Sequence, residues 1–338
     1  MKKFTALFLM LFGTCLLFLS CNSGKGKQAG KITVGVAVKQ FDNAYLTLMR
    51  NAIQEKADEI GIAVDITDGK TDQVTVTNNV DMYFTKGYPA IAVNLQDSAG
   101  AEGIIEKAKS KKVPVVFFNV EPDATAMNAY NMVYYVGAKA EASGTMQGEA
   151  IVEYWKANPG ADLNGDGVLQ YVMLMGEPGH QDAKLRTEYS VKAIVGAGIK
   201  VQEVALATAN WQRSQGQDVM AAILAANSNI EAVIANNDEM ALGAIEALKA
   251  KGYFTAGGKK IPVVGVDATV EAKAAIKDGT LYSSPFNDAV NQGYAVVKLC
   301  ELLAKGESPT TSNLGYELSG KYVWIPYVNV TSKNVDSF

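Results

Sequence analysis

The sequence is poor in cysteine and histidine and has no excess of positive charge. Its 338 residues include 3 cysteines and 1 histidine, and the formal net charge is −4. This acidic balance argues against nucleic acid as a partner, because phosphate binding needs clustered Lys and Arg. Cys15 lies in the N-terminal apolar run, which we assign below to a removed signal, and Cys21 is the expected lipid anchor, so Cys300 remains without a disulfide partner inside the fold. We expect Cys300 to pack in the core, because it stands in the apolar stretch 296–303.

The N-terminus has the pattern of an export signal. Met1-Lys2-Lys3 is positive, residues 4–19 are almost wholly apolar, and Ser20-Cys21 follows. We assign residues 1–20 to a signal peptide, because this apolar run is shorter than the roughly 20 residues that span a bilayer. A small residue directly before a cysteine resembles a bacterial lipobox and predicts that Cys21 is lipidated. An ordinary secretory signal cut elsewhere is the alternative.

Residues 21–30 are polar and rich in glycine, which is typical of a flexible tether. A lipid on Cys21 would anchor the mature chain to a membrane, so we expect a periplasmic or cell-envelope protein. Removing Lys2 and Lys3 from the 31 basic side chains leaves 29 against 35 acidic ones, a net charge of −6. No second membrane-length apolar run appears, and the length suggests two domains.

The rest of the chain alternates expected strands with expected helices. The strands are predicted at residues 32–38, 63–67, 90–94, 113–118, 133–136, 170–175, 202–207, 232–235, 262–266 and 322–328. Such alternation predicts an α/β fold with parallel sheets that helices cover on both faces. The pattern restarts after residue 118, which indicates two similar lobes.

Polar side chains follow most of these strands. In open parallel sheets, ligands bind beyond the carboxyl ends of the strands. A fan of amides and carboxylates suits a neutral polyol, because both groups bond well to hydroxyls. Each residue has a simpler explanation as a helix cap. The positions are Asn43, Asn94, Asn119, His180, Asp182, Asn237, Asp267 and Asn287.

Three further side chains are candidates for the same site. Arg186 lies four residues after Asp182 on an expected helix, so the two form either a surface ion pair or part of a cleft rim with His180. Trp211 follows an expected strand and Tyr45 opens the first helix. Aromatic rings stack on the apolar faces of pyranoses, but core packing is the alternative for both residues.

Residues 162–170 (DLNGDGVLQ) match most of a calcium-binding loop. Oxygen side chains stand at positions one, three, five and nine, a glycine at six and a backbone carbonyl at seven. The pattern then fails, because position twelve is Met173 and a strand follows. A polar Asp-Gly turn is the alternative. The proposed ligands within the loop are Asp162, Asn164, Asp166, Val168 and Gln170.

From about Ile32 to its end, the sequence resembles the periplasmic D-galactose/D-glucose-binding proteins of bacterial ABC import systems. The blocks that carry the resemblance are residues 115–122 (VVFFNVEP), 134–137 (YYVG), 176–182 (GEPGHQD), 233–238 (VIANND) and 265–267 (GVD). The calcium loop is itself a feature of this family. The resemblance implies the type I periplasmic-binding-protein fold, with two Rossmann-like lobes joined by three crossing segments.

On this basis we expect an N-terminal lobe of residues 31–114 and 288–322, and a C-terminal lobe of residues 115–287 and 323–338. The resemblance implies that Trp211 and Tyr45 sandwich the sugar, with Tyr45 where the family usually has Phe. It also supplies Glu231 as the missing carboxylate of the calcium site. The implied polar shell consists of Asn94, His180, Asp182, Arg186, Asn237, Asp267 and Asn287.

Two positions depart from the family. Asn43 stands where Asp is usual, and that Asp is associated with the hydroxyl that distinguishes galactose from glucose. Asn loses the charge-assisted bond, so the preference between the two epimers stays open. Gln181 stands where Pro is usual.

These features predict a monomeric receptor that captures D-glucose or D-galactose without chemistry. An ABC permease is the expected partner of the closed form, and a chemoreceptor is a second candidate. Another monosaccharide, such as ribose or xylose, is the nearest alternative. An enzyme that uses His180, Asp182 and Glu177 is a more distant one, because no nucleophile motif accompanies them. A transcriptional repressor is disfavoured, because an export signal stands where its DNA-binding headpiece would be.

Overall fold

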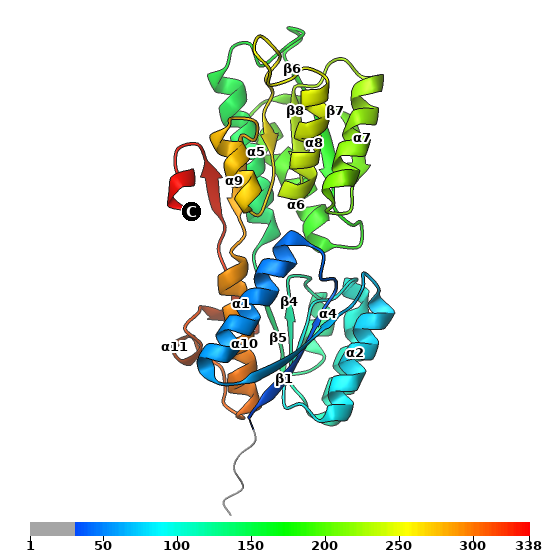
Figure 1. Cartoon of the computed structure of the whole chain (residues 1–338), viewed down its shortest axis with the longest axis vertical. Helices are drawn as coiled ribbons and strands as arrows, with labels where there is room; N and C mark the ends of the chain where they lie inside the picture. Colours follow the sequence, from blue (N-terminus) through cyan, green and yellow to red (C-terminus); the bar gives the residue numbers. More distant parts are fainter. Residues whose placement is uncertain (1–30) are drawn as a thin grey trace, which may run out of the picture. The chain divides into compact units, whose positions relative to one another are not determined.

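Two sheets organise residues 31–338, the part of the chain that the computed structural model describes. The predicted signal peptide, the tether and Cys21 lie outside the described residues. Each sheet forms the centre of one lobe, with helices on both faces, as the alternation of the sequence predicted (Figure 1).

The N-terminal lobe contains a seven-stranded sheet in the order β11-β12-β5-β4-β3-β1-β2. All neighbours are parallel except β11 and β12. The strands are β1 (Thr33–Val38), β2 (Ala63–Asp68), β3 (Ile91–Val93), β4 (Val115–Phe118), β5 (Val133–Gly137), β11 (Leu318–Ser319) and β12 (Tyr322–Trp324). The helices are α1 (Ala44–Ile60), α2 (Gln73–Lys86), η1 (Ser98–Gly100), α3 (Ala101–Lys111), α4 (Ala124–Asn128), α10 (Ala289–Ala304) and α11 (Thr311–Leu314).

The C-terminal lobe contains a six-stranded sheet in the order β13-β10-β9-β8-β6-β7. Only the β10–β13 pair is antiparallel. The strands are β6 (Val168–Met175), β7 (Lys200–Thr208), β8 (Ala232–Ala235), β9 (Val263–Val264), β10 (Ser283–Phe286) and β13 (Val328–Thr331). The helices are α5 (Ala140–Ala157), α6 (Gln181–Gly196), α7 (Arg213–Ala226), α8 (Asp238–Ala250), α9 (Val270–Lys277) and η2 (Val335–Ser337).

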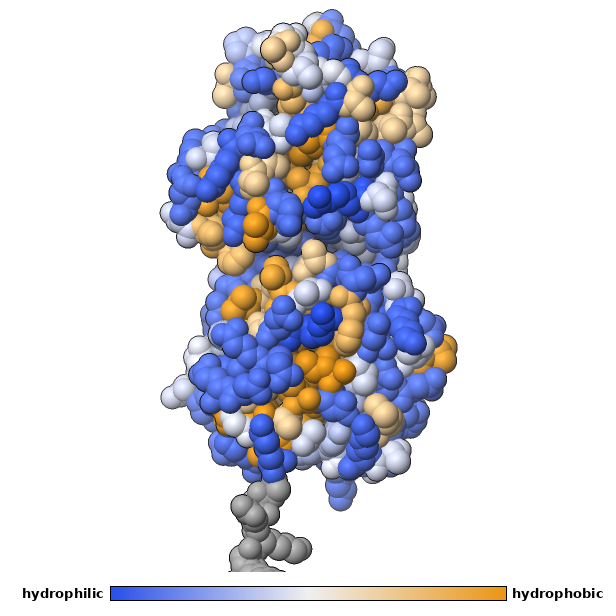
Figure 2. Space-filling view, viewed as in Figure 1, coloured by the Kyte–Doolittle hydropathy of each residue, from blue (hydrophilic) through white to orange (hydrophobic). Residues whose placement is uncertain are grey.

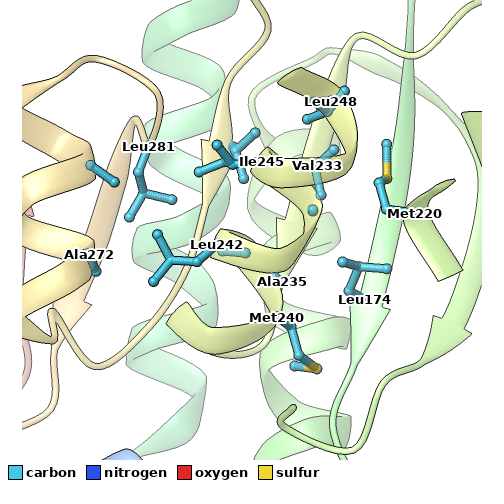
Figure 3. Packing of buried hydrophobic residues seen from close by; sticks show 14 of the residues in the cluster. Leu174, Met220, Val233, Ala235, Met240, Leu242, Ile245, Leu248, Ala272 and Leu281 are labelled. Carbon is cyan, nitrogen blue, oxygen red and sulfur yellow. The ribbon is translucent and has the colours of Figure 1, made fainter. Parts of the chain in front are cut away.

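Strand geometry divides each lobe into two apolar layers, because successive side chains point to opposite faces. On β1, Val34 and Val36 pack with residues of α1 and α10, and Ala37 packs with residues of α2 and α3. Cys300 of α10 lies fully buried in the first of these layers, as predicted. In the C-terminal lobe, Leu174 of β6 packs against α7 and α8 (Figure 3).

Three segments connect the lobes. They run from β5 to α5, from β10 to α10, and from β12 to β13. The predicted boundary at residue 114/115 is therefore wrong. Strand β4 pairs with β3, and β5 pairs with β4, so residues 115–137 belong to the N-terminal sheet. The predicted strand 322–328 is also two strands in different sheets, because the third crossing lies within it.

The surface carries few large apolar side chains. Hydrophilic residues dominate the face in Figure 2, and apolar ones form small patches among them. Within residues 31–338, no helix has both the length and the apolar character needed to cross a bilayer. The large apolar side chains that are exposed are Leu48, Val74, Val195, Leu206, Val270, Val290, Val328 and Phe338.

Candidate functional site

A cavity lies between the lobes, at the carboxyl ends of both sheets. Its volume of about 40 Å³ exceeds the roughly 10–15 Å³ that one water molecule needs, so it can admit a small polar ligand. It contains all of the predicted sugar-contacting residues except Asn94. The lining residues are Lys39, Asn43, Tyr45, Leu46, Asn119, His180, Asp182, Arg186, Trp211, Asn237, Asp267 and Asn287.

Arg186 is the centre of the polar wall on the C-terminal lobe. Its Nη2 donates to Asp182 Oδ2 and to the Tyr327 hydroxyl, both at 2.9 Å. Nη1 donates to the Asn236 carbonyl at 2.9 Å, and Nε donates to Ser143 Oγ at 3.2 Å. Burial raises the pKa of Asp182, and the neighbouring guanidinium opposes that rise. Because the ion pair is buried and held at several points, both side chains keep one orientation.

His180 is the N-cap of α6 and also lines the cavity. Its Nδ1 accepts the Asp182 backbone N–H at 3.2 Å. Burial, together with the charges of Lys39 and Arg186, holds the pKa of His180 well below its usual range. The imidazole is therefore neutral, and because Nδ1 accepts, Nε2 carries the proton and is a donor.

Asp267 and Asn287 form a second polar pair. Asn287 Nδ2 donates to Asp267 Oδ1 at 3.1 Å, and Gln292 Nε2 donates to Asn287 Oδ1 at 2.7 Å. Burial raises the pKa of Asp267 to about 7, although Arg186 and the Asn287 bond oppose the rise. At neutral pH, this carboxyl group therefore exchanges readily between an acceptor and a donor state.

Two aromatic rings from opposite lobes face the cavity. Tyr45 comes from α1, and Trp211 precedes α7; they are only 7% and 8% exposed. The Trp211 ring meets the His180 ring edge to face at 5.0 Å between centroids. A Cβ atom on Gly176 would collide with the Trp211 ring, so glycine is needed there to admit the indole.

Three residues that line the cavity have strained backbone conformations. Asn119, Trp211 and Asp267 line the cavity with φ angles of 63°, 64° and 116°, which non-glycine residues adopt rarely. Such strain persists only where the surroundings determine the conformation, and it is concentrated at functional sites.

Polar contacts join the two lobes beside the cavity. Lys39 Nζ of the N-terminal lobe bonds to Glu177 Oε2 of the C-terminal lobe at 2.6 Å, with side chains that are 4% and 16% exposed. Gln96 Nε2 donates to Glu177 Oε1 at 3.1 Å. Gln181 Nε2 donates to Glu121 Oε2 at 3.3 Å, so the position where the family usually has Pro contributes a contact between lobes.

Capping and cavity lining coincide at Asn43 and Asn237, as they do at His180. Asn43 Oδ1 accepts the Leu46 N–H at 2.9 Å, and Asn237 Oδ1 accepts the Met240 N–H at 3.0 Å. Both residues also line the cavity. The amide NH2 group of Asn43 is left for a ligand. The two explanations that the sequence left open are therefore compatible at these positions.

The predicted polar shell differs from the cavity wall at three residues. Asn94 lies behind the wall, where it accepts from Lys39 N at 3.3 Å and donates to Asn119 Oδ1 at 3.1 Å. Asn119 lines the cavity instead, and its place at the end of β4 was a usable signal. Lys39 was missed, because a lysine after a strand has no sequence feature that points to a distant partner.

The loop 162–170 gathers the predicted calcium ligands. Asp162 Oδ2 accepts from Gly167 N at 2.8 Å, and Gln170 Nε2 donates to Asp166 Oδ2 at 2.9 Å. Glu231 reaches the loop from just before β8 and accepts from Leu163 N at 2.6 Å and Gln170 N at 3.0 Å.

The donor set of this loop suits a hard cation, because every predicted ligand atom is an oxygen. Burial raises the pKa of Glu231, and the carboxylates of Asp162 and Asp166 add to the rise. Within residues 31–338, however, no three Asp, Glu, His or Cys side chains form a ready metal site. The amide oxygens of Asn164 and Gln170 and the Val168 carbonyl would have to complete the set.

The chain is similar to known proteins over nearly all of its length. Residues 34–308 match the periplasmic binding protein domain. The D-galactose/methyl-galactoside binding periplasmic protein MglB of Haemophilus influenzae is 41% identical, over 100% of this chain and 99% of that protein. A putative rhizopine-binding protein of Rhizobium meliloti is 32% identical, over 90% of this chain and 92% of its own.

A solved structure shows the same fold. An ABC transporter solute binding protein of Bacillus halodurans, with bound myo-inositol, superposes with a TM-score of 0.78 and is 30% identical, covering 92% of this chain and 98% of its own. The two sequence relatives are named as binding proteins and not as enzymes. The two-lobed fold and the matched length together show that this chain belongs to the periplasmic binding protein family.

Proposed function

We propose that this chain captures a neutral monosaccharide, D-galactose or D-glucose, in the cavity between its lobes and delivers it to an ABC importer. The main support for this proposal is the cavity lining, which combines an aromatic ring from each lobe with amide, carboxyl and imidazole groups. Such a wall matches a pyranose, which has apolar faces and a hydroxylated rim.

The charges of the wall support a neutral ligand. Two cations line the cavity, and each already has a carboxylate partner: Arg186 pairs with Asp182, and Lys39 pairs with Glu177. The remaining carboxyl group, Asp267, has a pKa of about 7 and is partly neutral. An anionic ligand would therefore have no unpaired countercharge in the cavity, and a cation would meet only the partly ionised Asp267.

The relatives narrow the sugar class. The Haemophilus influenzae protein is named for D-galactose and methyl-galactoside, and the Bacillus halodurans structure holds myo-inositol. All of these are polyols on a six-membered ring. The NH2 group of Asn43 replaces the carboxylate that the family usually places there, so this chain offers a donor at that point. We leave both epimers in the proposal.

Capture would proceed by closure. The open lobes admit the sugar, and the rings of Tyr45 and Trp211 cover its two faces. Ligand bonds from both lobes, together with the pairing of Lys39 and Glu177, favour the closed state. Two of the side chains that an enzyme would use as acid or base, Asp182 and Glu177, are ion-paired.

A titration tests this proposal. The mature chain, produced without its lipid, is titrated by calorimetry and Trp fluorescence with glucose, galactose, ribose, xylose and myo-inositol. We expect glucose or galactose to bind at least about tenfold more tightly than ribose or xylose, because polar groups left unpaired by a smaller sugar disfavour binding. A preference for ribose, xylose or myo-inositol would overturn the assignment to hexoses.

We further propose that loop 162–170 and Glu231 hold a structural calcium ion. Its oxygen-only ligands and the positive φ angles of Gly165 and Gly167, 77° and 72°, support a tight cation loop. Asp162→Ala should lower the unfolding midpoint and remove its dependence on calcium, with little change in sugar affinity. Thermal unfolding with calcium or with a chelator measures this, and Asp218→Ala on the exposed face of α7 is the matched control. If the unfolding midpoint of the unmodified chain does not depend on calcium, the proposal of a structural calcium ion is wrong.

The lipid anchor at Cys21 and recognition by a chemoreceptor are also proposals. The family implies a periplasmic location, and the N-terminal pattern Leu19-Ser20-Cys21 supports attachment to a membrane there. Incorporation of labelled palmitate into the expressed chain, but not into a Cys21→Ser variant, is the expected result. Size-exclusion chromatography with light scattering tests the expected monomer.

A further inference from the structure

Two residues that line the cavity each have a buried polar atom without a hydrogen-bond partner among the described residues. These atoms are the hydroxyl of Tyr45 and Nε1 of Trp211. A buried donor without a partner loses its bonds to water and gains none in exchange, which disfavours the closed state. For a residue at a binding site, the simplest resolution is that the ligand supplies the partner.

The surroundings of the Tyr45 hydroxyl are polar. Although Tyr45 belongs to the N-terminal lobe, its hydroxyl experiences the charges of Asp267, Arg186 and Asp182, all of the C-terminal lobe. These neighbours have other partners: Arg186 donates to four groups, Asp182 pairs with Arg186, and Asp267 accepts from Asn287. Burial raises the pKa of Tyr45 well above its ordinary value, so its oxygen keeps its proton and can donate.

The Tyr45 hydroxyl is not needed to cover a sugar face, because the ring alone does that. A phenylalanine, which the resembling family usually has here, would cover a sugar face with the same ring. The hydroxyl also makes no bond that holds α1 or the N-terminal core in place. Because it lies in the plane of the ring and beyond its edge, it cannot bond to the apolar face under the ring. It can reach a substituent at the rim of the ligand.

We propose that Tyr45 is a specificity-determining residue, whose hydroxyl donates a hydrogen bond to one rim oxygen of the bound sugar, on the side of Asp267 and Arg186. This inference rests on the proposed sugar-binding function. It implies that the protein distinguishes a sugar that carries this oxygen from the analogue that lacks it. A phenylalanine at this position could not make that distinction.

The test combines one substitution with a set of ligands. Calorimetry measures the affinity of the unmodified chain and of Tyr45→Phe for the preferred hexose and for its singly deoxygenated analogues. We expect Tyr45→Phe to weaken binding of the parent sugar by about three- to tenfold, the range of one net hydrogen bond. We expect one analogue, and only one, to bind both proteins equally, because it lacks the acceptor.

Two results would overturn the proposal. Equal weakening for every analogue would mean that the substitution disturbs stacking or closure. Unchanged or tighter binding of the parent sugar would mean that a trapped water, and not the sugar, takes the hydroxyl proton.

Tyr130→Phe is the matched control. The Tyr130 hydroxyl is also buried without a partner, but it lies in the core of the N-terminal lobe and does not line the cavity. We expect this variant to bind every ligand as the unmodified chain does. If the unmodified chain binds no sugar in the set, the proposed function itself fails and this inference fails with it. If the chain binds sugar and Tyr45→Phe behaves like Tyr130→Phe, only this inference fails.

Discussion

The two lobes contribute unlike halves to the site. On the C-terminal lobe, Arg186, Asp182 and His180 are bonded to one another or to the backbone of their own helix and sheet. On the N-terminal lobe, Lys39 reaches across to Glu177, and the Tyr45 hydroxyl has no partner. The Arg186, Asp182 and His180 wall of the C-terminal half is therefore organised before a ligand arrives, whereas Trp211 Nε1 and the N-terminal half are completed by the ligand and the opposite lobe. A preorganised half reduces the entropy lost on binding.

The largest expected loss of sugar affinity comes from a substitution in the C-terminal half of the site, at Trp211. Trp211→Ala removes the ring that covers one sugar face and leaves a gap above Gly176. We expect sugar affinity to fall by at least about 100-fold, the scale of a buried aromatic hot spot. Calorimetry at a temperature where the variant is folded measures this.

Trp155→Ala is the control for this prediction. Trp155 packs against the core of the same lobe, between α5 and the sheet, and does not line the cavity. We expect it to lower the unfolding midpoint and to leave sugar affinity unchanged. Undiminished affinity in Trp211→Ala would remove this ring from the site and make the comparison between the two halves meaningless.

The next effect tests the dependence of the N-terminal half on the opposite lobe. Glu177→Gln removes the charge that pairs with Lys39 but keeps the shape of the side chain. In the closed state, the lysine is then buried without a countercharge, whereas in an open state water can solvate it. We expect affinity to fall by about tenfold, and by the same factor for every sugar, because closure and not recognition is weakened.

Glu153→Gln is the matched control, because the Glu153–Lys333 pair is exposed, at 49% and 76%, and lies within one lobe. It should leave affinity unchanged. X-ray scattering of the sugar-bound proteins should detect a more open population in Glu177→Gln alone. A loss of affinity for one epimer only would mean that Glu177 positions a sugar contact and does not govern closure.

The contrast between the halves also explains which features could be predicted from sequence. The strand ends place side chains by geometry, so position alone made most cavity residues candidates, with helix capping as the alternative for each. Helix α10 is explained by its local sequence, because Asp288 caps it and apolar residues such as Val296, Leu299 and Cys300 recur at helical spacing. Lys39 could not be found, because its partner Glu177 is distant in the chain and only the packed lobes bring the two together.

The predicted lobe boundary was wrong for a different reason. A crossing segment follows a strand, as a helix connection within one sheet does, so strand alternation does not reveal where the chain changes sheets. Residues 325–327 illustrate this, because they read as a continuous strand with both neighbours and yet leave one sheet for the other. Asn94 is absent from the cavity lining, because the same strand-end position can face the cavity or support the wall behind it.

The last prediction concerns the other contact between lobes, at Glu121. This carboxyl group of the N-terminal lobe faces Asp182 and Glu141 of the C-terminal lobe and accepts from Gln181, with Lys139 nearby. Burial, together with the charges of Asp182 and Glu141, raises the pKa of Glu121 to about 7 in this structure, where the two lobes touch at Glu121. In a solvated open state, we expect its pKa near the ordinary value of about 4.3.

The direction of the pH effect follows from this difference. Because the closed-state pKa is higher, closure takes up a proton wherever the open state has lost it. Closure, and with it sugar affinity, should therefore weaken as pH rises from about 4.5 to about 7 and level off above that. Glu121→Gln stays neutral, so its affinity should equal that of the unmodified chain only below about pH 4, and the ratio in favour of the variant should grow with pH until about pH 7.

Calorimetry at several pH values measures both proteins with the same sugar. Asp267 also has a raised pKa, but it is present in both proteins, so the difference between them isolates Glu121. Parallel affinity curves for the two proteins across pH 5–8 would show that Glu121 does not change its protonation on closure. The N-terminal half would then contribute to closure through Lys39 alone, and its dependence on the opposite lobe would reduce to one ion pair.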